Sequence, residues 1–134
     1  MTDPIKVSVF HFSEGFDVRF LEDLYAGDTV MAEEIFHSSL EQLEESICAA
    51  DLHVILKDTE NLRRIMHRVK PVFGYMGLLF VQELVQQFED RCEPYRQMEE
   101  LVNAWRYLRQ IMCDSIRLAK HECLRLNEYN RMRA

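Results

Sequence analysis

Apolar side chains recur at alternating intervals of three and four residues along most of this 134-residue chain. Because an α-helix turns once in about 3.6 residues, this spacing gathers the side chains on one face of a helix. The two longest stripes are Phe36, Leu40, Leu43, Ile47, Ala50 and Val54, and Met98, Leu101, Trp105, Leu108, Met112, Ile116, Ala119 and Cys123. Only residues 5–10 alternate as a strand does. The pattern predicts a chain that is nearly all helix.

Capping residues and helix breakers divide the chain into segments. Asp and Thr favour helix starts, glycine favours helix ends, and the residue before a proline disfavours helix. The predicted helices span residues 17–25, 28–56, 58–76, 78–93 and 97–127. Four of them are long, amphipathic and joined by short connections, which is typical of a bundle. We therefore expect an all-α fold, an antiparallel up-down four-helix bundle with a short extra N-terminal helix.

Two segments need a more specific expectation. The short first helix should bury Phe16, Phe20, Leu21 and Leu24, and the fourth helix should bury Leu78, Val81, Leu84, Val85, Phe88 and Cys92. Residues 1–15 are expected to form an N-terminal extension and residues 16–134 the helical bundle domain. The extension is either extended chain or a loose helix that packs Val7, Phe10 and Phe12 on the bundle, and the sequence leaves both open.

Composition excludes several classes of function. The net charge of −7 makes the chain a poor candidate for nucleic-acid binding, which depends on neutralising phosphates. No run of 18 apolar residues predicts a membrane span, and residues 1–4 do not begin a signal peptide, so we expect a cytoplasmic protein. The four cysteines form no C-x-x-C pair and fall within helical patterns. They are interpreted as small reduced core residues, and no cofactor or metal is expected.

One histidine stands apart from the apolar stripe of its helix. The stripe consists of Leu62, Ile65, Met66, Val69, Val72, Phe73 and Met76. His67 lies roughly 160° from its centre and should therefore point to water. Arg63, Pro71 and Gly74 share its face, and Lys70 lies on the flank one turn further on.

The surface around this histidine is positively charged and carries small side chains on the C-terminal side. Arg63, Arg64, Arg68 and Lys70 form a local basic patch, which suits a phosphoryl group or an acidic pocket on a partner protein. A proline and a glycine destabilise a helix interior by about 3 and 1 kcal/mol, so neither Pro71 nor Gly74 stabilises this helix. Both residues would be useful if the backbone of a partner protein must come close to His67. The alternative is that they only kink or end the helix, that the basic residues are a solvated face, and that the histidine is an ordinary surface residue.

This stretch resembles the motif of histidine-containing phosphotransfer (HPt) domains. The matching residues are His67-Arg68-Val69-Lys70, with Gly74 at +7 and Gly77 at +10. Asp58 lies nine residues before the histidine, where that family often has a helix cap, and Phe88-Glu89 resembles its apolar-Glu pair on the next helix. The resemblance covers residues 16–127 as architecture, with a specific motif of about a dozen residues.

The resemblance implies a phosphorelay carrier rather than an enzyme. His67 would accept and donate the phosphoryl group, Lys70 would help neutralise its oxygens, and Gly74 would leave room for a partner. The implied partners are response-regulator receiver domains or a hybrid sensor histidine kinase, whose acidic pocket Arg63, Arg64 and Arg68 would attract. The chief departure is Pro71, where the family has glycine, and its ring should tilt the helix at His67.

Two other functions fit parts of the sequence. A helical adaptor could keep the docking surface and transfer nothing, with Pro71 as the mark of lost chemistry. A metal-binding bundle could use Glu34 and His37, which have the Glu-x-x-His spacing of di-iron sites, although no second copy of that motif is present. His11, His53 and His121 have no partner at metal-ligand spacing and are interpreted as surface or boundary residues.

Overall fold

The computed structural model describes residues 9–93 and 96–133, and all its regular structure is helical. The elements in this part of the chain are α1 (Val18–Tyr25), α2 (Thr29–Ile55), α3 (Thr59–Tyr75), α4 (Leu79–Arg91), the short 3-10 helix η2 (Met98–Glu100) and α5 (Val102–Arg133). The predicted all-α bundle with an extra N-terminal helix is confirmed.

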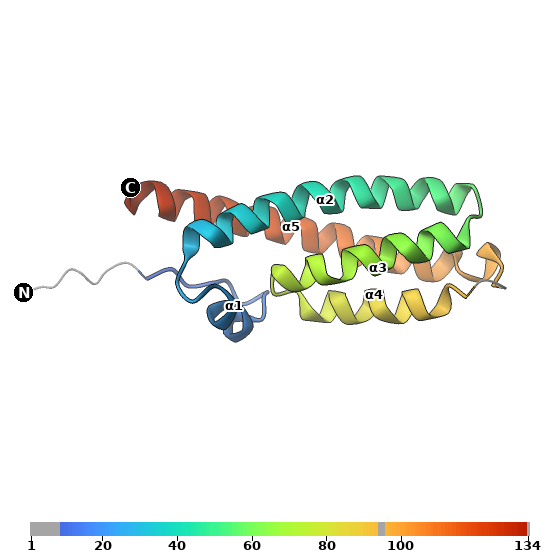
Figure 1. The fold of residues 1–134 in the computed structure, drawn as a ribbon, viewed down its shortest axis with the longest axis horizontal. Helices are drawn as coiled ribbons and strands as arrows, with labels where there is room; N and C mark the ends of the chain where they lie inside the picture. Colours follow the sequence, from blue (N-terminus) through green and yellow to red (C-terminus); the bar gives the residue numbers. More distant parts are fainter. Residues whose placement is uncertain (1–8, 94–95, 134) are drawn as a thin grey trace, which may run out of the picture.

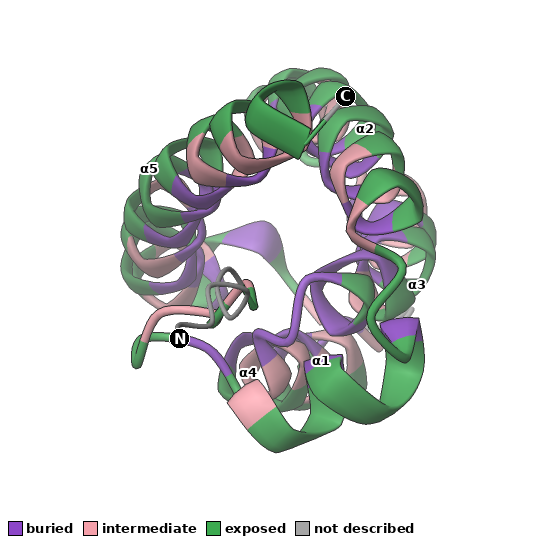
Figure 2. Cartoon of the chain, turned by 90° about the vertical axis from the view of Figure 1, so that its left-hand side faces the viewer, coloured by how far each residue is buried: buried purple, intermediate pink, exposed green. Residues whose placement is uncertain are grey.

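The four long helices run along one common axis (Figure 1), with α2 beside α3 and α5, and α4 beside α3 and α5. Viewed along the bundle, buried residues line the inner sides of the helices and exposed ones the outer sides (Figure 2). At about 1.5 Å per residue, α2 and α5 are roughly 40 and 48 Å long, against roughly 26 and 20 Å for α3 and α4. The start of α2 and the end of α5 extend past the other two helices, as Figure 1 shows.

Helix starts follow the capping residues closely. Asp17, Asp28 and Asp58 are the N-caps of α1, α2 and α3, and each carboxylate accepts a hydrogen bond from the backbone N–H three residues on, at 3.0–3.1 Å. Helix ends were predicted less well. The last helix runs to residue 133 rather than 127, and α4 ends at Arg91. Pro94, which was expected to stop it, lies outside the described residues.

The core contains most of the predicted stripe residues, with corrections in α1 and among the cysteines. Phe16 and Leu21 are buried as expected, but Phe20 and Leu24 are 37% and 43% exposed. The prediction is wrong for these two because α1 packs through Leu21 and Tyr25, which leaves the adjacent face of this short helix in solvent. Leu84 and Val54 are only half-buried.

The cysteines differ from one another in burial. Cys92 is buried, and burial raises the pKa of its thiol to about 12. Cys113 and Cys123 are half-buried. Cys48 is exposed, so the prediction of a core position is wrong for it. It follows Ile47, which takes the core position on α2, and the next residue of a helix is turned about 100° away.

The turn between α3 and α4 requires glycine at position 77. Gly77 has φ +69°, and the hydrogen bonds Leu78 N to Phe73 O (3.0 Å) and Gly77 N to Gly74 O (2.9 Å) form a Schellman motif. A Cβ atom added at Gly77 would lie 2.6 Å from Leu21 Cγ of α1. The glycine thus both ends α3 and admits α1 against the turn.

Two further hydrogen bonds fasten α1 to this end of the bundle. Asp17 N donates to Gly77 O at 2.8 Å, and Tyr25 Oη donates to the backbone oxygen of Tyr75, the last residue of α3, at 2.5 Å. The final turn of α3 is therefore held from outside the helix as well as by its own hydrogen bonds.

The ionisation of Tyr25 should limit stability at alkaline pH. Burial, with a smaller contribution from Tyr75, raises the pKa of Tyr25 from 10 to about 12. The neutral phenol therefore stabilises the folded state fully below pH 10, and this stabilisation is lost as pH rises from 10 through 12. Two pKa units correspond to about 2–3 kcal/mol. Urea unfolding at pH 8, 10 and 11 should show a steeper loss for the natural chain than for Tyr25→Phe, and parallel curves would contradict the prediction.

The described part of the N-terminal extension packs against the overhang of α2 and α5. Phe10 and Phe12 are partly buried on the core, and residues 9–12 are not helical. Ser13 donates from its backbone N and its Oγ to the buried carboxylate of Glu122 at 2.7 and 2.6 Å. The guanidinium of Arg125 bonds the same carboxylate at 3.0 Å and lies 4.7 Å above the Phe10 ring. Val7 lies outside the described residues.

Candidate functional site

His67 lies where α3 faces α4, and its side chain is 66% exposed. The apolar stripe of α3 is buried beneath it, from Leu62 to Phe73. The predicted orientation of the imidazole toward water is confirmed. Such an exposed imidazole can be reached by another protein without any rearrangement of the core.

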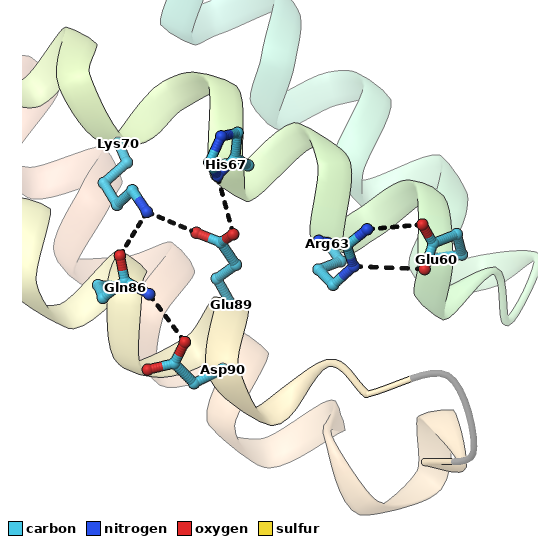
Figure 3. Close-up of polar contacts among 7 residues, drawn as sticks. All are labelled: Glu60, Arg63, His67, Lys70, Gln86, Glu89 and Asp90. Atoms are coloured by element: carbon cyan, nitrogen blue, oxygen red, sulfur yellow. Dashed lines mark hydrogen bonds and ion pairs between the residues drawn. The ribbon is translucent and has the colours of Figure 1, made fainter.

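A single carboxylate from α4 holds both His67 and Lys70 (Figure 3). Glu89 Oε2 lies 2.9 Å from His67 Nδ1, and Glu89 Oε1 accepts a hydrogen bond from Lys70 Nζ at 2.8 Å. The Glu89 side chain is only 11% exposed, so it is a fixed support beneath an exposed ring. The sequence suggested Glu89 only through the family resemblance, and the structure brings it to the histidine.

The hydrogen bond to Glu89 selects the tautomer of His67. Burial alone would raise the pKa of Glu89, but hydrogen bonds from Lys70 and His67 outweigh burial and hold that pKa below its usual value. The carboxylate is therefore ionised at neutral pH and can only accept hydrogen bonds. Nδ1 of the neutral imidazole must carry the proton, which leaves the lone pair on Nε2. The ring thus presents a basic, nucleophilic nitrogen.

Lys70 is held by two side chains of α4. Its side chain is 18% exposed, and its ammonium donates to Gln86 Oε1 as well as to Glu89. Gln86 Nε2 in turn donates to Asp90 Oδ1 at 2.8 Å. Sequence reasoning missed Gln86 and Asp90. The polar spacing of Gln82, Gln86 and Glu89 along α4 was a usable signal, because residues three and four apart share a helix face.

Two of the four cations in the predicted basic patch, Arg63 and Arg64, share one carboxylate within α3. Glu60, which sequence reasoning missed, accepts hydrogen bonds from Arg63 at 2.7 and 3.3 Å and from Arg64 at 3.2 Å. The hydrogen bond from Arg63 lowers the pKa of Glu60. Arg68 is exposed and has no hydrogen bond or ion pair to any described residue. It is the cation of the patch without a carboxylate partner in the described part of the chain.

Pro71 and Gly74 differ in their placement. Pro71 is exposed within α3, which continues to Tyr75, so the proline does not end the helix. Gly74 is buried, because the side chain of Gln82 covers it: an added Cβ would lie 3.0 Å from Gln82 Oε1. The expectation that Gly74 shares the open face of His67 is wrong. A partner could use that space only after Gln82 moved.

The other histidines are not drawn into this site. His37 is exposed on α2 and lies 3.5 Å from Glu41 of the same helix. His53 lies 3.5 Å from Asp58 at the α2–α3 turn. Within residues 9–93 and 96–133, no three histidine, cysteine or acidic side chains gather as metal ligands would. The cluster of His67, Lys70, Gln86 and Glu89 therefore remains the candidate site.

Comparison with known proteins gives one match. The model of the Hpt domain family matches residues 30–121, which include nearly all of α2, the whole of α3 and α4, and most of α5. No curated protein and no solved structure matches the chain. None of the helices in the described part of the chain has the length and apolar character needed to span a bilayer.

Proposed function

Because the chain belongs to the Hpt domain family of phosphotransfer signalling modules, we propose that it is a phosphorelay carrier that takes a phosphoryl group onto His67 and passes it on. The donor and acceptor are aspartates of response-regulator receiver domains, or the donor is a hybrid sensor histidine kinase. The observation that carries the proposal is the exposed imidazole whose Nδ1 is held by the ionised Glu89, with Lys70 on the same carboxylate.

The transfer step uses Nε2 as the nucleophile. Its lone pair attacks the phosphorus of the receiver's aspartyl phosphate, the bond from phosphorus to the aspartate oxygen breaks, and the aspartate leaves as a carboxylate. The proton on Nδ1 stays in place, so the phosphorylated ring carries a positive charge. Glu89, 2.9 Å from Nδ1, stabilises that charge as it develops. The reverse sequence returns the group to another aspartate.

Lys70 supplies positive charge near the phosphoryl oxygens. Its side chain lies one turn C-terminal to His67, and helical side chains lean toward the N-terminus, so the ammonium leans toward the imidazole. A lysine acts on phosphate as a point charge without strict geometry. Glu89 and Gln86 hold the ammonium until the phosphoryl group arrives.

The cations around His67 favour an acidic partner. Receiver domains present an acidic pocket around the aspartate, and charge complementarity mainly increases the rate of encounter. Arg68 supports docking directly, because it has no partner among the described residues. Arg63 and Arg64 contribute less in the free protein, since both are bound to Glu60.

A second candidate function is a helical adaptor that binds receiver or kinase domains without phosphotransfer. The observation that favours it is Pro71, an exposed proline one turn after the histidine. As an adaptor, the protein would bind a receiver, but the pyrrolidine ring of Pro71 would keep the receiver's phosphoaspartate too far from His67 Nε2 for attack.

Phosphotransfer with isolated receivers tests the proposal. The protein is incubated with a panel of phosphorylated receiver domains, and the transferred label is examined for the acid lability and base stability of a phosphoramidate. Mass spectrometry then locates it, and we expect it on the peptide that contains His67. Binding to the same receivers is measured in parallel. Receivers that bind without passing any label would establish the adaptor instead, and receivers that neither bind nor transfer would contradict both functions.

Removing the charge of Glu89 should slow the transfer. Glu89→Gln keeps the size of the side chain and an acceptor for Nδ1, but it loses the negative charge that stabilises the phosphorylated ring and orients Lys70. We expect the rate of single-turnover phosphoryl uptake to fall about tenfold or more. The matched control is Glu83→Gln, an exposed residue on the same helix. Equal effects of the two substitutions would rule out a role for Glu89.

A further inference from the structure

Pro71 is costly where it stands, and no packing offsets the cost. A proline within a helix removes a backbone hydrogen bond and crowds the carbonyl one turn back, at about 3 kcal/mol. Pro71 lies four residues before the end of α3, and its side chain is exposed rather than packed in the core. The pyrrolidine ring therefore makes no core contact that would stabilise the fold. Residues that weaken a fold without a packing gain concentrate at functional sites.

The fold tolerates Pro71 because the last turn of α3 is held by other contacts. The Schellman hydrogen bonds fix the turn at Gly77, and Tyr25 Oη of α1 bonds the backbone oxygen of Tyr75. These contacts all lie C-terminal to the proline. The segment that carries His67 is held separately, through Glu89 of α4. The helix does not depend on the hydrogen bond that Pro71 cannot make.

The proline gives the surface beside His67 two distinctive features. The first is an apolar strip made of Pro71 and Tyr75, which are one turn apart on the same face, with Tyr75 48% exposed. The second is the backbone oxygen of His67, which has no helical N–H partner because residue 71 has no N–H. Both features lie within about two helical turns of the imidazole, close enough for a domain docked at His67 to cover them.

We infer that Pro71 is a specificity-determining residue, which selects among receiver domains rather than blocking them all. The inference rests on the proposed function and names its partner more closely. The selected receiver places an apolar side chain from the rim of its acidic pocket on the Pro71–Tyr75 strip and a hydrogen-bond donor near the free His67 oxygen. A receiver that needs close backbone approach at position 71 is disfavoured by the ring.

Three variants separate the parts of this surface. Pro71→Ala restores the helical N–H and keeps one methyl group, Pro71→Gly restores the N–H and leaves no side chain, and Tyr75→Ala shortens the apolar strip while keeping the backbone oxygen that Tyr25 bonds. The two position-71 variants should also be more stable than the natural chain. The control for added stability is Lys57→Gly, because Lys57 lies in the α2–α3 turn with φ 58°, a conformation that favours glycine. The substitution also removes an ion pair with Glu99, which is exposed and contributes little to stability.

The measurement is the second-order rate constant of phosphoryl transfer from each receiver of a panel. For the receiver that the natural chain uses fastest, Pro71→Ala and Pro71→Gly should lower this constant about tenfold, while poorly used receivers keep or gain rate. Tyr75→Ala should act in the same direction, and Lys57→Gly should leave the ranking unchanged.

Other outcomes overturn the inference in distinguishable ways. If the Pro71 variants change every receiver by the same factor, or none, transfer through His67 stands but Pro71 does not set specificity. If they raise the rate for all receivers, the proline is an obstacle rather than a selector. If the natural chain takes no phosphoryl group from any receiver, the proposed function and this inference fail together.

Discussion

The His67→Gln variant should fold as stably as the natural chain and take up no phosphoryl group from any receiver. The side chain is 66% exposed, and exposed substitutions usually change stability by no more than about 0.5 kcal/mol. Glutamine can still donate a hydrogen bond to Glu89, but its amide nitrogen is no nucleophile. We expect the label to fall at least about a thousandfold, to the limit of detection. Phosphotransfer assays and thermal unfolding followed by circular dichroism measure the two parts of this prediction.

A second histidine provides the control. His37 is as exposed as His67, with 70% of its side chain accessible, but it lies on α2 beside Glu41. His37→Gln should retain full labelling. Labelling that survives in His67→Gln and disappears in His37→Gln would move the acceptor to α2 and reverse our assignment.

Replacing Gly77 with alanine should remove a large part of the stability of the bundle. The backbone at residue 77 has φ +69°, which costs a residue with a Cβ about 1–2 kcal/mol. The new Cβ would also lie 2.6 Å from Leu21 Cγ, and such overpacking typically costs about 1–3 kcal/mol. The two effects together predict a loss of about 2–5 kcal/mol, against a total of roughly 5–15 kcal/mol for a domain. Urea unfolding measures this loss.

Gly27 separates the two contributions. It has φ +82°, but nothing lies within 4 Å of the Cβ that alanine would add there. Gly27→Ala should therefore lose only the backbone contribution of about 1–2 kcal/mol. The difference between the two variants measures the contact with Leu21, and Leu21→Ala should reduce that difference. Equal losses of unfolding free energy at Gly27 and Gly77 would show that the contact with Leu21 of α1 does not restrict position 77.

Features that depend on local chemistry could be predicted from the sequence. The aspartates at 17, 28 and 58 cap helices because a short carboxylate reaches the first free N–H groups of its own helix. The long stripes are also reliable, since six to eight apolar residues at helical spacing define one face. In α1, with eight residues, neighbouring faces are both apolar, and the contact with Gly77 decides which is buried.

Only part of the candidate site could be predicted, because tertiary packing also decides which side chains of α4 reach α3. Exposure of His67 and the position of Lys70 follow from the periodicity of α3 alone. The partners from α4 do not, because the alignment of Glu89, Gln86 and Gln82 with α3 depends on how the two helices pack. Periodicity placed Gly74 beside His67, but it could not show that a side chain of the next helix covers it.

The shared carboxylate of Glu89 has a consequence for how firmly a phosphoryl group would be held. When the imidazole of His67 is neutral, it sums with the cationic Lys70 and the anionic Glu89 to no net charge. A phosphoryl group brings a charge of about −1.5 to −2, and the ring gains only one positive charge in return. The phosphorylated cluster is thus left with excess negative charge, and Lys70 is shared between two anions. If the proposed function is right, this excess negative charge would favour passing the phosphoryl group to an acceptor over retaining it on His67.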